Sequence, residues 1–190
     1  MHLFPGRMTK PFAVVRRRRV MRSGDPGIVR AAPPVDDAFG AFWSADHAAV
    51  LAVAAALTGD WATAEDITQD AFSAAYRRWD EIDNPAGWVR RVVANRAASH
   101  WRRRAREGAA FARLAARPSP VLLGRENDEF WQTVRALPRR QAQVVTLRYL
   151  DELSLSEIAE VLEIAEGTVK ATLSHARSAL AHVLSLEEGP

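Results

Sequence analysis

The chain of 190 residues is long enough for one medium domain or two small ones, and small domains bury too little surface to be stable without support from partners or from each other. It has no cysteine, which excludes disulfides and thiolate metal sites. Its five histidines are scattered and do not have the spacing of metal ligands, so we expect no metal and no cofactor. No run approaches the roughly 18 apolar residues of a membrane span and the first residues lack the apolar core of a signal peptide, so we expect a cytoplasmic protein without membrane insertion.

The net charge of +3 hides a segregation of opposite charges along the chain. Residues 1–35 carry eight basic and one acidic side chain, and residues 36–87 carry two and ten. Residues 88–117 carry nine and one, and residues 118–190 carry seven and eleven. An acidic block beside a basic block suggests two different partners.

Two segments have the composition of disordered chain. Residues 1–35 mix prolines and glycines with a run of four arginines and predict a disordered basic tail; the run could touch nucleic acid, but a solvated tail is the simpler interpretation. Residues 107–124 hold glycines and prolines among small and basic residues and predict a flexible linker. The predicted fold is therefore all-α, with two small helical domains on either side of this linker.

The first domain, residues 36–106, follows a helical pattern with two clear breaks and predicts a bundle of three to four helices. The expected helices cover residues 37–57, 61–79 and 86–104. Asp60 is a good N-cap for the second of them, and Pro85 suits the first turn of the third.

The second domain, residues 125–186, predicts four helices, of which the last two have the spacing of a helix-turn-helix. Ser154 and Glu157 have the spacing of a capping box, and the small Ala159 lets the two helices cross closely. The second of these helices would lie in the major groove of DNA. Its outward side chains are Thr168, Lys170, Ala171, Ser174, His175 and Arg177. An ordinary helical hairpin is the alternative interpretation.

Two positions depart from the usual helix-turn-helix pattern. Glu163 stands where the turn favours glycine, and Ala165 stands where a serine or threonine would cap the second helix; each departure costs about 1 kcal/mol. The domain is also net acidic. We therefore expect it to bind DNA weakly by itself, because phosphate neutralisation supplies most non-specific affinity.

The first domain carries two surfaces of opposite charge. One face of its second predicted helix is acidic and contains Glu65, Asp66, Gln69 and Asp70; such a face is either a docking site or simply solvated. The third predicted helix interleaves arginines with tryptophans, which suits single-stranded DNA because bases stack on aromatic rings while guanidiniums follow the phosphates. At least one of Trp79, Trp88 and Trp101 is expected in the core instead.

Two segments of the chain resemble a known family. Residues 57–104, which include TAEDITQDAF and NPAGWVRRVVANRAASHWRRR, resemble region 2 of the extracytoplasmic-function sigma factors of the sigma-70 family. Residues 136–180, which include LSLSEIAEVLEIAEGTVKATLSHARSAL, resemble region 4 of the same family. The alanine-rich and arginine-rich style is similar to actinobacterial members.

The resemblance implies a non-enzymatic sigma factor that binds core RNA polymerase at its β′ coiled coil and β flap, recognises the −10 and −35 promoter elements and promotes DNA melting. The resemblance is also compatible with an anti-sigma factor as a further partner. It implies no small-molecule substrate.

The resemblance also assigns roles to residues. It assigns polymerase binding to Glu65, Asp66, Gln69, Asp70 and Phe72. It assigns recognition of the −10 element to the loop 80–87 and to Trp88, Arg90, Arg91, Asn95, Arg96, Trp101 and Arg102. Asn95 falls at a polar position associated with the pocket for an extruded base. The six outward residues of the last helix are assigned to the −35 element.

Two other interpretations remain open from the residues alone. A regulator that binds an operator without polymerase docking would use the same helix-turn-helix and would normally dimerise, but it leaves the acidic helix unexplained. A helical adaptor would use its charged blocks to bind only proteins. An enzyme is not expected, since no His, Asp, Glu or Ser constellation has catalytic spacing.

Overall fold

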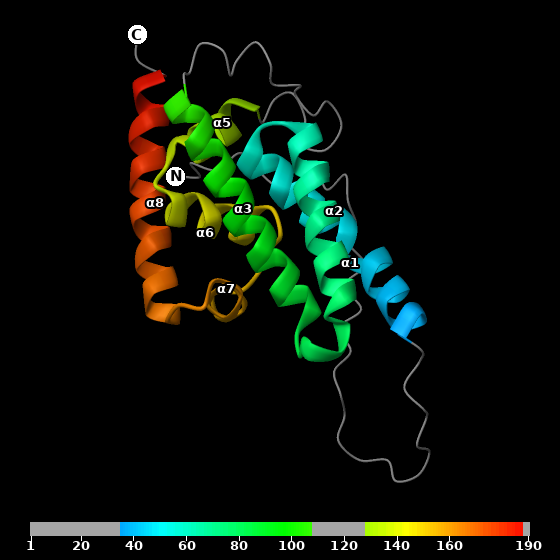
Figure 1. Ribbon diagram of the computed structural model, residues 1–190. Helices are drawn as coiled ribbons and strands as arrows, with labels where there is room; N and C mark the ends of the chain where they lie inside the picture. The colour runs from blue at the N-terminus through cyan, green and yellow to red at the C-terminus, as the bar shows by residue number, and fades with distance from the viewer. Residues whose placement is uncertain (1–34, 108–127, 188–190) are drawn as a thin grey trace.

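The computed structural model describes residues 35–107 and 128–187, and all regular elements in these residues are helices (Figure 1). The first unit contains α1 (Val35–Thr58), α2 (Trp61–Arg77), the 3-10 turn η1 (Trp79–Glu81) and α3 (Pro85–Glu107). The second unit contains α5 (Asp128–Ala136), α6 (Arg139–Tyr149), α7 (Leu155–Leu162) and α8 (Glu166–Glu187). The all-α prediction is confirmed. Of the tail predicted for residues 1–35 and the linker predicted for residues 107–124, residues 35 and 107 are the ends of helices α1 and α3, and the rest lie outside the described residues.

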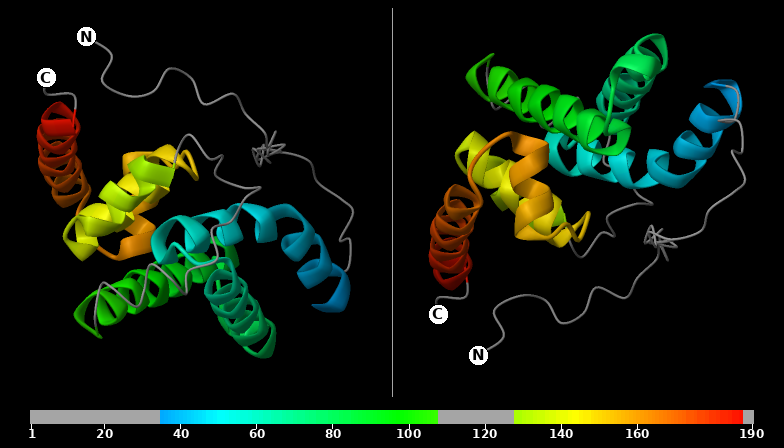
Figure 2. Two further views of the ribbon diagram at one scale, coloured as in Figure 1. Left: turned by 90° about the horizontal axis from the view of Figure 1, so that it is seen from above. Right: turned by 90° about the horizontal axis from the view of Figure 1, so that it is seen from below.

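The two units pack against each other. Figure 2 shows α5, α6 and α7 gathered against α1 and α3, with α8 on the outside and α2 on the side that faces away from the second unit. One hydrophobic core extends through both units and includes Leu57 of α1, Val93 of α3, Trp131 of α5 and Leu147 of α6. Each unit is too small to bury much surface alone. The shared core therefore stabilises both units, as expected for two small domains.

Helix α1 is long and apolar enough to cross a membrane by length and composition, over Asp37–Thr58. Its second half is buried: all of residues 50–58 except Ala52 are buried, because they pack against α2 and α3. The apolar composition of α1 is therefore that of a core helix.

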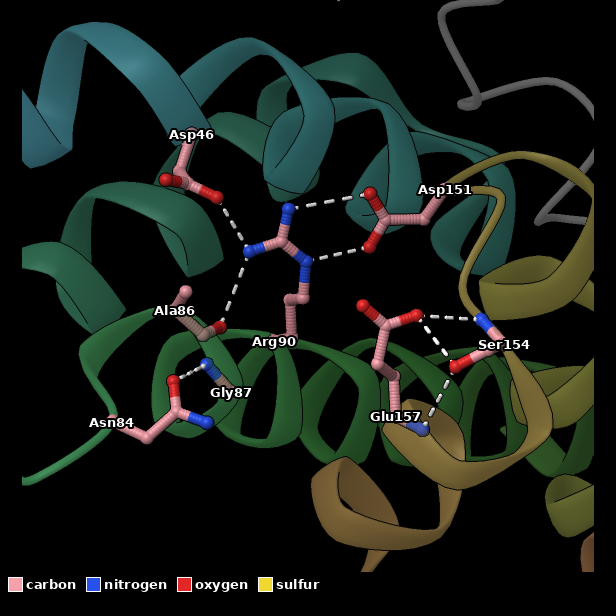
Figure 3. A network of polar contacts seen from close by, with 8 residues as sticks. All are labelled: Asp46, Asn84, Ala86, Gly87, Arg90, Asp151, Ser154 and Glu157. Carbon is pink, nitrogen blue, oxygen red and sulfur yellow. Dashed lines mark hydrogen bonds and ion pairs between the residues drawn. The ribbon is translucent and has the colours of Figure 1, made fainter. Parts of the chain in front are cut away.

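The helices begin where short-range capping interactions place them. The Asp60 carboxylate accepts the N–H of Thr63 at 3.0 Å and caps α2. The Asn84 Oδ1 accepts the N–H of Gly87 at 2.9 Å ahead of α3, whose first residue, Pro85, has no N–H to leave unpaired (Figure 3). These starts confirm the predicted beginnings of the second and third helices.

Helices α7 and α8 form the predicted helix-turn-helix. In the capping box the Ser154 Oγ accepts the N–H of Glu157 at 3.2 Å, and the Glu157 carboxylate accepts the N–H of Ser154 at 2.7 Å (Figure 3). The helices cross over buried side chains, Ile158 and Leu162 from α7 and Val169 and Leu173 from α8. Glu163 ends α7 in the left-handed conformation, at φ 52° and ψ 50°, in the position where glycine was expected.

Candidate nucleic-acid and partner interfaces

The outer face of α8 is an open surface. All six predicted recognition residues, Thr168, Lys170, Ala171, Ser174, His175 and Arg177, are exposed, while Val169 and Ala176 point into the core. Arg177 is held in place by Tyr149, because its Nε donates to the tyrosine hydroxyl at 2.7 Å and its guanidinium lies 5.8 Å from the ring centroid. We name these six residues the recognition face.

Helix α2 presents a second open surface, which we name the acidic row. It consists of Glu65, Asp66, Gln69 and Asp70, all exposed. Arg96 of α3 donates to Asp70 at 3.2 Å, but both side chains are at least half exposed, so this pair contributes little stability and leaves the row negative.

Phe72 was expected to bind polymerase together with these residues, but in the structure its side chain does not lie on this surface. The side chain has no exposed area and lies in an aromatic cluster, with ring centroids 4.8 Å from Trp43 and 5.2 Å from Phe42. Phe72 follows Thr68 and Ala71 on the buried side of α2, opposite the acidic row. Its function is to anchor α2 on α1.

The same cluster reaches the surface at two residues that the sequence analysis did not single out. Trp43 and Tyr76 are the large hydrophobic side chains that stay exposed in the described residues, at 36% and 46%. The His47 ring stacks on Trp43 at 4.2 Å. Burial lowers the pKa of His47, and the Glu65 carboxylate acts in the opposite direction. In the sequence, the spacing of Phe39, Phe42 and Trp43 along α1 is the feature that could have indicated this aromatic cluster.

The basic helix α3 is partly accessible. Most of the preceding loop is exposed, including Asp80, Glu81, Asp83 and Asn84, and so is Arg96. Trp88 is half-buried beside Arg78, whose guanidinium lies 6.0 Å from the ring, and Trp101 is half-buried beside Arg135 at 5.3 Å. The Arg102 side chain lies outside the described residues. Trp79 contacts the rings of Phe39 and Phe42, and Trp88 is the one of the three tryptophans that packs against the hydrophobic core.

Arg90 is covered by the second unit. Its Nε donates to Asp151 at 2.6 Å and its Nη1 to Asp46 at 2.6 Å, and Nη1 also reaches the Ala86 carbonyl at 3.3 Å (Figure 3). Only 9% of the residue is exposed. Burial by itself lowers the pKa of the Arg90 guanidinium, but Asp151 and then Asp46 outweigh burial and hold this pKa above its ordinary value. The Arg90 guanidinium is therefore charged and bound to two carboxylates.

Asn95 is covered in the same way by α6. Its Oδ1 accepts from Arg139 Nη2 at 2.5 Å and from Gln143 Nε2 at 2.9 Å. Gln143 also donates to the Ala94 carbonyl at 3.1 Å and has no exposed area. One turn earlier, Arg91 forms an ion pair with Glu163 of the helix-turn-helix.

The site residues thus fall into two groups. The recognition face and the acidic row are open, whereas Arg90 and Asn95 lie between the units and Arg91 lies at the edge of this contact. Within the described residues, no group of three histidine, aspartate or glutamate side chains is placed to hold a metal ion. The fold and surfaces define an all-α DNA-binding protein that has a helix-turn-helix in its second unit and an exposed acidic helix, α2, in its first.

Comparisons with known proteins agree with this class. The family model for sigma-70 region 2 matches residues 42–107, and the model for sigma-70 region 4 matches residues 127–180. The chain is 31% identical to the RNA polymerase sigma-E factor of Streptomyces coelicolor over 70% of its length and 77% of that protein. The chain is also 30% identical to the ECF RNA polymerase sigma factor SigW of Bacillus subtilis. This match covers 65% of the chain and 76% of SigW.

Two further similarities add to these. The probable RNA polymerase sigma factor RfaY of Xanthomonas campestris is 31% identical over 81% of the chain, which spans 42% of that protein's length. The fold is similar to that of the sigma factor RpoE of Bartonella quintana, solved in complex with the anti-sigma factor NepR, with a TM-score of 0.62 and 23% identity over 78% of the chain and 98% of that structure. The chain belongs to the extracytoplasmic-function group of the sigma-70 family of RNA polymerase sigma factors. Such proteins are transcription initiation factors and not enzymes.

Proposed function

We propose that this sigma factor docks on core RNA polymerase through the acidic row of α2, with the β′ coiled coil as the partner surface. Glu65, Asp66 and Asp70 stand on successive turns of one rigid helix and are exposed together. Phe72 and Ala71 anchor that helix in the core, so the row is presented in a fixed position. A basic surface on the polymerase would be complementary to it.

The recognition face of α8 reads the −35 element in this proposal. Lys170, Ala171, Ser174 and His175 face the bases, and Arg177, held by Tyr149, contacts a phosphate. The second unit offers few basic side chains among several exposed glutamates, such as Glu160 and Glu166. Its affinity for DNA alone is therefore low, and polymerase docking supplies the local concentration that it needs.

The loop 80–87 and helix α3 read the −10 element. Trp88 and Arg96 are accessible for stacking and phosphate contact, and Asn95 lines the pocket for an extruded base once α6 moves away. The protein acts in the cytoplasm, where the polymerase is. Because the solved relative from Bartonella quintana is bound to an anti-sigma factor, an anti-sigma factor is a further partner that we propose for this chain.

The observation that carries the proposal is the joint exposure of an acidic row on one unit and a recognition face on the other. It is tested by binding of full-length variants to purified core polymerase. Charge reversal at Asp66→Lys and Asp70→Lys is expected to abolish binding and to leave the helical circular dichroism spectrum unchanged.

The matched control reverses two other exposed carboxylates of the same unit, Asp37→Lys and Asp83→Lys, which lie outside α2. This control is expected to bind normally. Normal binding of the α2 double variant would refute the docking assignment.

A further inference from the structure

The loop between α2 and α3 is held by side-chain contacts of its own. This loop, residues 80–87, carries the proposed −10 assignment and lies at the lower end of α2 and α3 in Figure 1. Where α3 begins, the Asn84 side chain accepts the N–H of Gly87. Most of the loop is exposed, although Asn95, further along α3, is covered by α6. The loop is therefore accessible in the conformation that the structure shows.

Arg78 connects the two ends of this loop. Its Nε donates to the Glu81 carboxylate at 2.9 Å, within the turn η1. Its guanidinium lies 6.0 Å from the centroid of the Trp88 ring, in the first turn of α3. At this distance the π electrons of an indole ring attract a cation. One side chain thus contacts a residue at the start of the loop and a residue directly after its end.

The backbone of Arg78 is fixed as well. Its N–H donates to the Ala75 carbonyl and ends α2, and its carbonyl accepts the N–H of Glu81 at 2.9 Å. Trp88, at the other end of the contact, packs against the hydrophobic core. The Arg78 side chain therefore extends from a fixed backbone to a fixed ring, although 54% of it is exposed.

The contacts of Arg78 are too weak to hold the fold together, because both lie in water. They are strong enough to select among conformations of the loop, which packs against the core through Ile82 and exposes most of its other side chains. Such segments open and rearrange at low free-energy cost. Recognition of a base requires the binding groups to be held within about 0.5 Å, so the conformation of the loop limits its selectivity.

We propose that Arg78 is a positioning residue for recognition of the −10 element, and that it holds the loop between Glu81 and Trp88 in the form that reads the extruded base. The inference rests on the proposed assignment of −10 recognition to this loop and α3. Arg78 acts through the loop and does not itself read the base. The competing role for an exposed arginine beside DNA is a contact with a phosphate, which carries no sequence information.

The neighbouring Arg77 provides a matched control. It is the last residue of α2, it is exposed, and it carries the same charge as Arg78. In the part of the chain that the structure describes, its side chain forms no hydrogen bond or ion pair. Replacing Arg77 by alanine therefore removes the same charge from the same place without removing a contact to the loop.

The test measures which sequences the holoenzyme selects. Core polymerase with each full-length variant binds a DNA library in which the −10 element is randomised, and the bound DNA is sequenced. Arg78→Ala is expected to lower the preference for the selected bases about fivefold, which corresponds to about 1 kcal/mol at 1.4 kcal/mol per factor of ten. Arg77→Ala is expected to keep the preference. Arg78→Lys keeps the charge but lacks the planar group that bonds Glu81 and stacks on Trp88, so it is expected to behave like Arg78→Ala.

The salt dependence of binding separates positioning from a phosphate contact. Loss of one phosphate contact lowers the slope of log Kd against log salt concentration by about 0.7–0.9. Positioning predicts that Arg78→Ala loses selectivity with an unchanged slope. Even weakening across all sequences, with a lower slope and rescue by Arg78→Lys, would overturn the inference and make Arg78 a phosphate contact.

A second variant distinguishes failure of this inference from failure of the proposed function. Asp80→Ala with Asp83→Ala changes two exposed side chains of the same loop and leaves Arg78 in place. If this variant alters the selected bases while Arg78→Ala behaves like Arg77→Ala, the positioning role is overturned and the −10 assignment stands. If neither Arg78→Ala nor the loop variant alters the selection, both are overturned.

Discussion

The placement of Phe72 predicts that its replacement acts on stability and not on polymerase contact. The ring has no exposed area and lies within about 4.8–6.5 Å of the aromatic rings of Trp43, Phe42, His47 and Phe39, measured between centroids. Phe72→Ala removes this packing and leaves a cavity, which costs about 3–5 kcal/mol. That cost is a large part of the 5–15 kcal/mol that typically stabilises a small protein.

Urea unfolding followed by tryptophan fluorescence measures this cost, since Trp43 reports directly on the site. Phe72→Leu fills most of the space and is expected to lose much less stability, and Ser73→Ala, on the neighbouring exposed position, is expected to lose almost none. The reasoning fails if Phe72→Ala unfolds like the parent protein but no longer binds core polymerase, because that result would place the ring on the docking surface.

Three further predictions concern the helix ends and the recognition face. Gly59→Ala forces a Cβ into the left-handed region and against Arg135, so it should lower the free energy of unfolding by on the order of 1–2 kcal/mol in chemical denaturation. Ser154→Ala removes the capping box of α7 and should cost about 1 kcal/mol in the same assay; no loss would mean that the cap is dispensable. In binding of the polymerase complex to a library of randomised −35 elements, His175→Ala should change the selected sequence. Arg177→Ala should weaken binding evenly, and a changed selection with this variant would contradict its role as a phosphate contact.

The starts of the helices could be predicted from the sequence because the interactions that fix them are local. Asp60 with Thr63, and Ser154 with Glu157, are pairs three residues apart, so the residues that make the cap are visible together in the sequence. The crossing of α7 and α8 was predictable for a related reason: helical spacing places Ile158 and Val169 on the faces that meet.

The contacts between the units could not be predicted in this way. Arg90 and Asp151 are 61 positions apart, and Asn95 and Gln143 are 48 apart, and no local pattern relates residues at such separations. Arg90 lies on a helix with the composition expected of a DNA-binding helix. Whether Arg90 is buried depends on which surface packs over that helix. For the same reason the sequence does not single out Trp131, which is the largest fully buried side chain in the part of the chain that the structure describes.

The conformation of Glu163 could be predicted from the sequence, but its partner could not. Its place in the turn, and its departure from glycine, were visible in the sequence, and the structure confirms the left-handed conformation. Its partner, Arg91, was not visible, because it lies on a helix of the other unit. A residue that breaks a local rule often takes part in a non-local contact, and here that contact joins the two units.

Reconstituted transcription tests the assignment of this chain as a promoter-reading initiation factor most directly. Core polymerase transcribes sheared genomic DNA from the source organism with and without the purified protein, and the 5′ ends of the transcripts are sequenced. The account predicts start sites that require the protein and share two upstream elements at a fixed spacing, and predicts their loss with the Asp66→Lys and Asp70→Lys variant. The same start sites with and without the protein would contradict it.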